Sequence, residues 1–236
     1  MFRSLANPPR WYPVQYTQGL RRPVARSFNK ELCEVENMAT SFDFDGFASC
    51  LYDAAKAAFS AIQRTHEGEA FYSFALFTSG DMAYVFPTAS TEQGLTQVAH
   101  QYFEKGEATG SNLQQERDAL RWSPGDSPLH MEGQAFFEAV NKLTATIGDI
   151  VGEFPEDSWD EFDAFVAQFI TVCINVLKRL DAEGLFGKDN QRNAITLNIL
   201  MGDQSDEEML KYAKLLNPPP VYERFRKELS SGQLEE

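Results

Sequence analysis

The chain has 236 residues and a formal net charge of −14, and it is long enough to bury one sizeable hydrophobic core. Residues 1–37 carry six Lys or Arg and three Glu, whereas residues 38–236 carry fifteen Lys or Arg and thirty-two Asp or Glu, a charge of −17. This acidity argues against nucleic acid and anionic membranes as partners and favours a basic partner, unless it serves solubility alone.

The first 37 residues differ in composition from the rest of the chain. Residues 1–30 contain five Arg, one Lys and four Pro, with no acidic residue. An Arg-rich, acid-poor segment is typical of a mitochondrial transit peptide, but the prolines argue against the amphipathic helix that such a peptide needs. Because Met38 directly precedes a capped helix, we interpret residues 1–37 as a disordered or mis-called extension. Residues 38–236 are then predicted to form a single globular domain.

The globular pattern begins with a helix and a hairpin. A helix is predicted from an N-cap at Ser41 to about Arg64, because apolar residues recur there every three or four positions. Residues 71–78 and 82–88 flank Ser79-Gly80-Asp81, a pattern typical of a β-hairpin. Further helices are predicted over 91–104 and 132–147, and a short strand over 118–122.

The second half of the chain carries clear helix signals. A long helix is predicted over about 158–182, with a capping box at Ser158 and Glu161 and basic residues in its last turn. A second capping box, formed by Ser205 and Glu208, predicts another helix start. That helix should end at Asn217, because prolines follow directly.

These elements together predict the fold class. Residues 194–201 are rich in branched side chains and are typical of a strand that is buried on at least one face. We therefore predict a single α+β domain with a small, mainly antiparallel sheet, made from a hairpin near 71–88 and the strand near 194–201. Several helices, one of them long, are expected to cover this sheet.

Five segments are distinctive in their combination and their order. They are FDGFASCLYDAAKAAF at 44–59, FYSFALFTSGD at 71–81, LRWSPGD at 120–126, GLFG at 184–187 and GDQSDEEMLKYAKLLNPPPVYERF at 202–225. Over roughly residues 42–229 the chain resembles the bacterial family called domain of unknown function 4303. The resemblance implies no activity and no active-site residues, but it suggests an association with toxin–immunity gene clusters.

Catalytic and metal-binding motifs are not found in the sequence. His66, His100 and His130 are isolated and lack the spacing of metal ligands. The run GLFGK at 184–188 lacks the spacing of a phosphate loop and is interpreted as a helix C-cap. Acidic residues at 156–163 and 203–208 are expected at helix starts without any metal. We therefore predict no cofactor and no metal site.

Cysteine usage and hydropathy bear on localisation. Cys33, Cys50 and Cys173 are widely separated, odd in number and outside any CxxC motif, so they are predicted to be free thiols in a reducing compartment. No segment approaches the ~18 uninterrupted apolar residues of a membrane-spanning helix. We therefore predict a cytoplasmic protein.

Two loops carry the candidate binding residues, apart from Arg192, which precedes the strand predicted over 194–201. Arg121, Trp122 and Asp126 flank a tight turn, and Arg and Trp are residue types that dominate binding hot spots. A loop at the end of a predicted strand adds the acidic residues Asp203 and Asp206. For the first loop the alternative is purely structural, with Trp122 anchoring the loop to the core and Arg121 pairing locally with Asp126.

Two hypotheses for the function remain. The first is an acidic protein-interaction module, one form of which is an immunity protein that neutralises a basic toxin. The second is an enzyme whose dispersed active site lies around Arg121, Asp126, Arg192 and Asp203. Because an interaction module needs no catalytic residues, the lack of catalytic motifs favours the first hypothesis. A deep polar pocket that contains several of the four residues would favour the second.

Overall fold

The computed structural model describes residues 42–152, 159–202 and 204–231, which belong to one compact unit, Ala39–Glu236. Several sequence predictions fall outside these described residues. They concern the segment 1–37 with Cys33, the capping residues Ser41 and Ser158, and the candidate binding residue Asp203.

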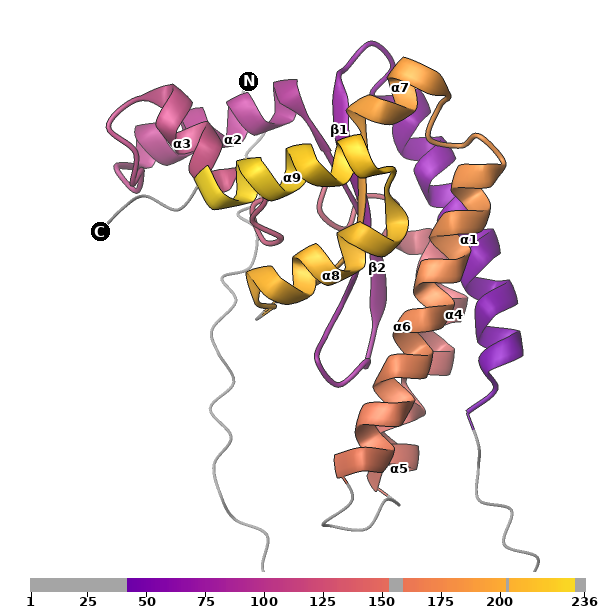
Figure 1. Cartoon of the computed structure of the whole chain (residues 1–236). Helices are drawn as coiled ribbons and strands as arrows, with labels where there is room; N and C mark the ends of the chain where they lie inside the picture. Colours follow the sequence, from indigo (N-terminus) through magenta and orange to yellow (C-terminus); the bar gives the residue numbers. More distant parts are fainter. Residues whose placement is uncertain (1–41, 153–158, 203, 232–236) are drawn as a thin grey trace, which may run out of the picture. The chain divides into compact units, whose positions relative to one another are not determined.

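A three-stranded mixed sheet forms the centre of this unit, in the strand order β2-β1-β3 (Figure 1). β1 (Phe71–Thr78) and β2 (Val85–Thr91) form the predicted antiparallel hairpin, and β3 (Thr196–Met201) pairs with β1. The β1–β3 pairing is parallel, so the sheet is mixed and not mainly antiparallel as expected. A parallel neighbour needs a long crossover, and the helices between β2 and β3 supply it. The predicted α+β class is confirmed.

The side chains that alternate along the strands give the sheet an apolar face and a polar face. The apolar face carries Phe74, Leu76, Leu197 and Ile199, which belong to the main hydrophobic core. The polar face is defined by the register of the three strands. One row across it contains Ser90, Ser73 and Thr196, and the next contains Thr88, Ala75 and Asn198.

Two long helices cover the apolar face. α1 (Phe44–Thr65) and α6 (Trp159–Ala182) lie against each other on this side of the sheet (Figure 1). Their contact includes the stacked rings of Phe47 and Phe169, whose centroids are 4.7 Å apart. Phe59 of α1 packs edge-on against Phe74 at 5.4 Å. The N-cap of α1 is Asp43, whose carboxylate accepts from the Gly46 amide at 2.9 Å.

Later helices cover the polar face. α8 (Asp206–Leu216) and α9 (Pro219–Ser231) both contact β3, and α7 (Asp189–Ala194) leads into that strand. The predicted capping box of α8 is present, with the Glu208 amide donating to Ser205 Oγ at 3.3 Å and the Ser205 amide donating back to the Glu208 carboxylate at 3.1 Å. α8 ends before the prolines, as predicted. The same prolines then begin α9, because proline suits the first turn of a helix.

Two predicted elements differ from the structure. The strand expected over 118–122 is wrong, because α3 (Leu113–Leu120) occupies this region beside α2 (Glu92–Lys105). The buried Glu116 carboxylate explains the helix, since it accepts hydrogen bonds from the Thr109 and Gly110 amides and holds the preceding loop against α3.

The helix expected over 132–147 is broken into shorter pieces. They are η1 (Gln134–Phe137), α4 (Glu138–Thr144) and α5 (Ile147–Gly152). Gly133 precedes η1 and has φ +80°. This left-handed backbone conformation does not fit within a right-handed helix, so η1 begins only after it. The Thr144 hydroxyl donates to the Ala83 carbonyl at 2.9 Å, and Asn141 accepts from the Val85 amide at 2.8 Å. Long-range bonds to the hairpin therefore set where α4 lies.

Candidate functional site

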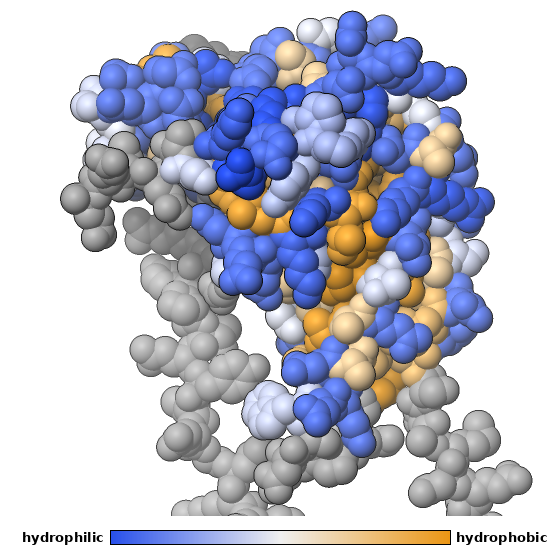
Figure 2. Space-filling model, in the orientation of Figure 1, coloured by the Kyte–Doolittle hydropathy of each residue, from blue (hydrophilic) through white to orange (hydrophobic). Residues whose placement is uncertain are grey.

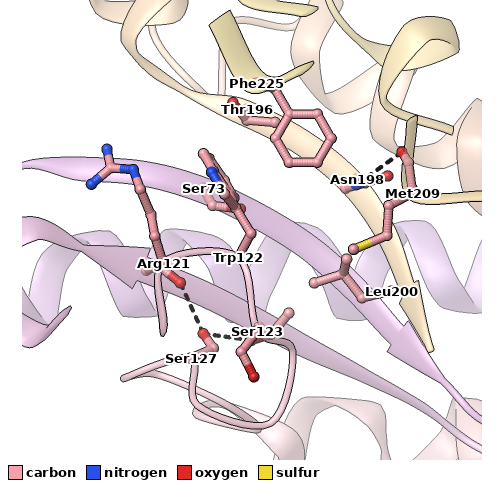
Figure 3. A pocket seen from close by; sticks show the side chains of 12 residues that line it. Ser73, Arg121, Trp122, Ser123, Ser127, Thr196, Asn198, Leu200, Met209 and Phe225 are labelled. Atoms are coloured by element: carbon pink, nitrogen blue, oxygen red, sulfur yellow. Dashed lines mark hydrogen bonds between the residues drawn. The ribbon is translucent and has the colours of Figure 1, made fainter. Parts of the chain in front are cut away.

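A small cavity of about 20 Å³ lies on the polar face of the sheet. Its floor comes from all three strands, and Trp122, Met209 and Phe225 cover it from the other side (Figure 3). We call it the Trp122 cavity. Its lining residues are Ser73, Thr88, Ser90, Arg121, Trp122, Ser123, Ser127, Thr196, Asn198, Leu200, Met209 and Phe225.

A hydroxyl network ties the loop after Trp122 to the sheet. Thr88 donates to Ser127 Oγ at 2.9 Å, and Ser90 Oγ lies at the same distance from it. Ser127 in turn donates to the Ala89 carbonyl at 2.8 Å. Hydrogen bonds, and not apolar contacts alone, therefore fix this loop over the polar face.

Trp122 is wedged between the sheet and α9. Its ring meets Tyr72 edge-to-face at 5.3 Å and Phe225 edge-to-face at 4.7 Å. Its Nε1–H is buried and has no hydrogen-bond partner within the described ranges. Trp122 thus anchors its loop, as the structural alternative for this segment supposed, and it also brings an unpaired donor into the interior.

Arg121 is the C-cap residue of α3, and its side chain binds both α2 and α9. It donates to Glu92 of α2 at 2.6 and 3.0 Å and to Glu228 of α9 at 3.1 Å, and it stacks over the Tyr72 ring at 4.2 Å. Burial lowers the pKa of Arg121, but the hydrogen bond and the charge of Glu92 outweigh this, and the pKa lies above its usual value. The same hydrogen bond lowers the pKa of Glu92.

Asp126 has other partners than Arg121. It accepts from the Tyr102 hydroxyl at 2.5 Å and from the Ser123 hydroxyl at 2.7 Å. The hydrogen bond to Asp126 raises the pKa of Tyr102 to about 12. The expected local pairing of Arg121 with Asp126 is therefore wrong, because each side chain is engaged by a different element.

A groove of about 210 Å³ lies on the outer side of Trp122. We call it the Trp122 groove. Three carboxylates from α3, α8 and α9 line it together with apolar side chains. The lining consists of Asp118, Ala119, Trp122, Ser123, Pro124, Asp206, Met209, Glu228 and Leu229.

The groove combines predicted residues with residues that sequence reasoning missed. Trp122 and Asp206 were predicted, although they are far apart in the chain. Asp118 and Glu228 were not singled out, because an exposed acid on a helix is ordinary in sequence. Asp118 accepts from the Gln114 amide at 2.8 Å, and Glu228 accepts from Arg121. Only the packing of α3, α8 and α9 brings these acids together.

Arg192 is separate from both sites. It is 7% exposed and donates to Asp181 at 2.5 Å and to the carbonyl oxygens of Ile195 and Leu216. These bonds join the end of α6 to Ile195, the residue before β3, and to the end of α8. Arg192 lines neither the Trp122 cavity nor the Trp122 groove, so neither of these two sites brings it together with Arg121 or Asp126.

The three histidines have unrelated surroundings. His66 lies between Glu69 at 3.0 Å and Glu132 at 2.9 Å, whereas His100 is exposed. His130 packs edge-on against Phe77 at 4.7 Å. Among the residues with described positions, no group of three or more His, Cys, Asp or Glu side chains is placed to hold a metal ion.

Three further features are the cysteines, the hydropathy of the helices and the polarity of the surface. Cys50 and Cys173 are free thiols, and burial raises the pKa of both. No helix within the described ranges is both long and apolar enough to cross a membrane. In the view of Figure 2 the surface over α2, α3 and α9 is mostly hydrophilic, while apolar surface appears where α8 meets α6.

The fold and these sites define an α+β domain that has a buried polar sheet face and an acidic surface groove. Residues 51–218 match the family described as Domain of unknown function (DUF4303). Since the match covers more than half of the chain, the chain belongs to this family. No curated protein and no solved structure matches it. The family description assigns no activity, so the function has to be argued from the geometry.

Proposed function

We propose that the chain is an acidic protein-interaction module that binds a basic protein through the Trp122 groove. One observation carries the proposal. The carboxylates of Asp118, Asp206 and Glu228 come from three separate helices and line one groove together with Trp122 and Leu229.

The shape and chemistry of the groove suit a basic side chain. Lys and Arg have an apolar stem that packs on apolar surface and a charged end that prefers carboxylates. Trp122 and Leu229 offer the apolar surface. Asp118, which accepts from a neutral glutamine amide, offers negative charge, whereas Glu228 is already paired with Arg121. Aromatic and Arg side chains at such positions dominate the binding energy of many interfaces.

The charge of residues 38–236 supports a basic partner as well. Residues 38–236 carry a formal charge of −17, which attracts a basic protein over a distance beyond direct contact. Such steering raises association rates by roughly 10–10³-fold and weakens as salt is added. We therefore expect association that is fast at low ionic strength and strongly dependent on salt.

The particular form of this proposal is an immunity protein whose partner is a basic toxin. A protein that neutralises a toxin by covering it needs no catalytic groups. This form is supported by the acidity of residues 38–236. Co-expression of the captured partner, with and without this chain, tests it through cell growth.

The test of the interaction is a pull-down with the full-length chain from a lysate of its source, at low and at high salt. We expect one stoichiometric basic protein that is lost at high salt. Asp118→Lys reverses a charge in the groove and should abolish capture. Asp53→Lys, on an exposed position of α1, makes the same change of net charge and should leave capture largely intact.

Each contrary outcome has a clear meaning. Equal loss with both variants would show that only net charge matters and that the groove is not the site. Retention with Asp118→Lys would remove the groove from the proposal. No basic partner at either salt would contradict the interaction module in this form.

A further inference from the structure

The Trp122 cavity contains a donor that the protein itself leaves unpaired. Trp122 Nε1–H is buried, and no residue in the described ranges accepts its hydrogen bond. Buried donors in folded proteins are nearly always paired, either with protein atoms or with ordered water, because an unpaired one is costly. An acceptor for this N–H is therefore expected within the cavity that Trp122 lines.

The volume of the cavity restricts what that acceptor can be. It measures about 20 Å³. A single water needs about 10–15 Å³ of such space, so the cavity suits one water and no molecule with several non-hydrogen atoms. An organic ligand would require Trp122 to move away.

The lining supplies the polar partners that a water needs. An internal water makes about three hydrogen bonds to buried polar groups. Ser73 lies between Ser90 and Thr196 on the central strand, and it takes no part in the Ser127 network. Its hydroxyl can both donate and accept. A metal cation is disfavoured, because the lining has no carboxylate and includes Arg121.

We propose that the Trp122 cavity is a binding site for one ordered water molecule. The water accepts a hydrogen bond from Trp122 Nε1 and is held by the Ser73 hydroxyl. It links the indole to the central strand of the sheet and so fixes the orientation of a side chain that also forms a wall of the Trp122 groove. Ser73 is thereby a positioning residue for the groove. The water site rests on the cavity alone and does not depend on the proposed partner.

Nuclear magnetic resonance of the full-length chain with ¹⁵N-labelled tryptophan tests this site. The chain has three tryptophans, and Trp122→Phe identifies the indole signal of Trp122 by its loss. We expect NOE and ROE cross-peaks of opposite sign between water and Trp122 Nε1–H. Opposite signs identify a bound water, whereas hydrogen exchange with solvent gives the same sign in both.

Two variants make the test specific. Ser73→Val replaces the hydroxyl with methyl groups that fill the cavity, so the water cross-peak should disappear. Ser90→Ala removes a neighbouring hydroxyl that already pairs with Ser127, so the cross-peak should remain. If Ser73→Val does not fold, Ser73→Ala gives the same readout, with an expected weakening or loss of the cross-peak.

Several outcomes would overturn the proposal. Cross-peaks of equal sign, or none, in the unaltered chain would show that no long-lived water contacts the indole. A Trp122 signal that shifts with chloride concentration would assign the cavity to an anion. A cross-peak that survives Ser73→Val would place the water elsewhere.

Discussion

The two faces of the sheet are both buried, but they are held in different ways. On the apolar face, Phe74 and its neighbours pack against α1 and α6, and ring contacts such as Phe59–Phe74 dominate. On the polar face, Ser127 ties its loop to the sheet through hydrogen bonds, and Arg121 joins α2 to α9. Apolar packing is non-directional and supplies most of the stability, whereas hydrogen bonds require one geometry. Both candidate sites lie where the directional contacts are.

The largest expected effect concerns the apolar face. Phe74→Ala removes a fully buried ring and leaves a cavity between α1 and the sheet. We expect a loss of about 3–5 kcal/mol in the free energy of unfolding, measured by chemical denaturation. A loss below about 1 kcal/mol would mean that this face does not supply most of the stability.

A smaller effect is expected from the polar contacts. Arg121→Ala removes the hydrogen bonds that join Glu92 to Glu228, while Arg117 still donates to Glu92. We expect a loss of about 2–3 kcal/mol in the free energy of unfolding. Arg121→Lys should recover only part of it, since lysine lacks the planar fork that engages both acids.

A double-mutant cycle sharpens the Arg121 prediction. Glu92→Gln alone and together with Arg121→Ala should give losses that are not additive, because the two side chains share one contact. Additive losses would show that the ion pair contributes little and that Arg121 acts through packing on Tyr72.

The smallest expected effect concerns how the free energy of unfolding depends on pH through two histidines, His66 and His130. Burial lowers the pKa of His66, but its hydrogen bonds to Glu69 and Glu132 outweigh this and raise it. Its contribution to stability is thus fully present below its ordinary pKa of about 6.5 and is lost as pH rises through the raised value. The pKa shift of His130 has the opposite sign, because burial against the polar face lowers its pKa. Its contribution is present above about 6.5 and is lost as pH falls.

The measurement is the free energy of unfolding from pH 5 to 9 for the unaltered chain and two variants. Relative to the unaltered chain, His66→Gln should lose most stability at low pH, and His130→Gln should lose most at neutral and high pH. Parallel curves for both variants would contradict the assigned surroundings. NMR titration of the two imidazole rings gives the direction of each pKa shift directly.

Local signals explain the elements that sequence reasoning predicted correctly. The capping box of Ser205 and Glu208 needs only neighbouring residues, and the structure contains it. The hairpin is likewise local, although its second strand begins at Val85, a few residues later than expected. Helix α6 shows the expected periodicity over nearly all of its predicted length.

Contacts between residues far apart in the chain explain the predictions that were wrong or missing. The strand expected over 118–122 depended on composition alone, whereas Glu116 stabilises a helix there through bonds to a loop. The parallel pairing of β3 depends on where the long crossover returns the chain to the second edge of β1. α9 was missed because a proline cluster ends one helix and begins another with the same residues.

By itself, the sequence determined the α+β class, the approximate bounds of α1, α2 and α8, and the net negative charge. Periodicity, capping and net charge are local or additive properties, so they can be read without a fold. Only the tertiary structure decided that Asp118, Asp206 and Glu228 share a groove and that Trp122 lies over Ser73. Those juxtapositions arise from burial between elements far apart in the chain, which no local pattern encodes.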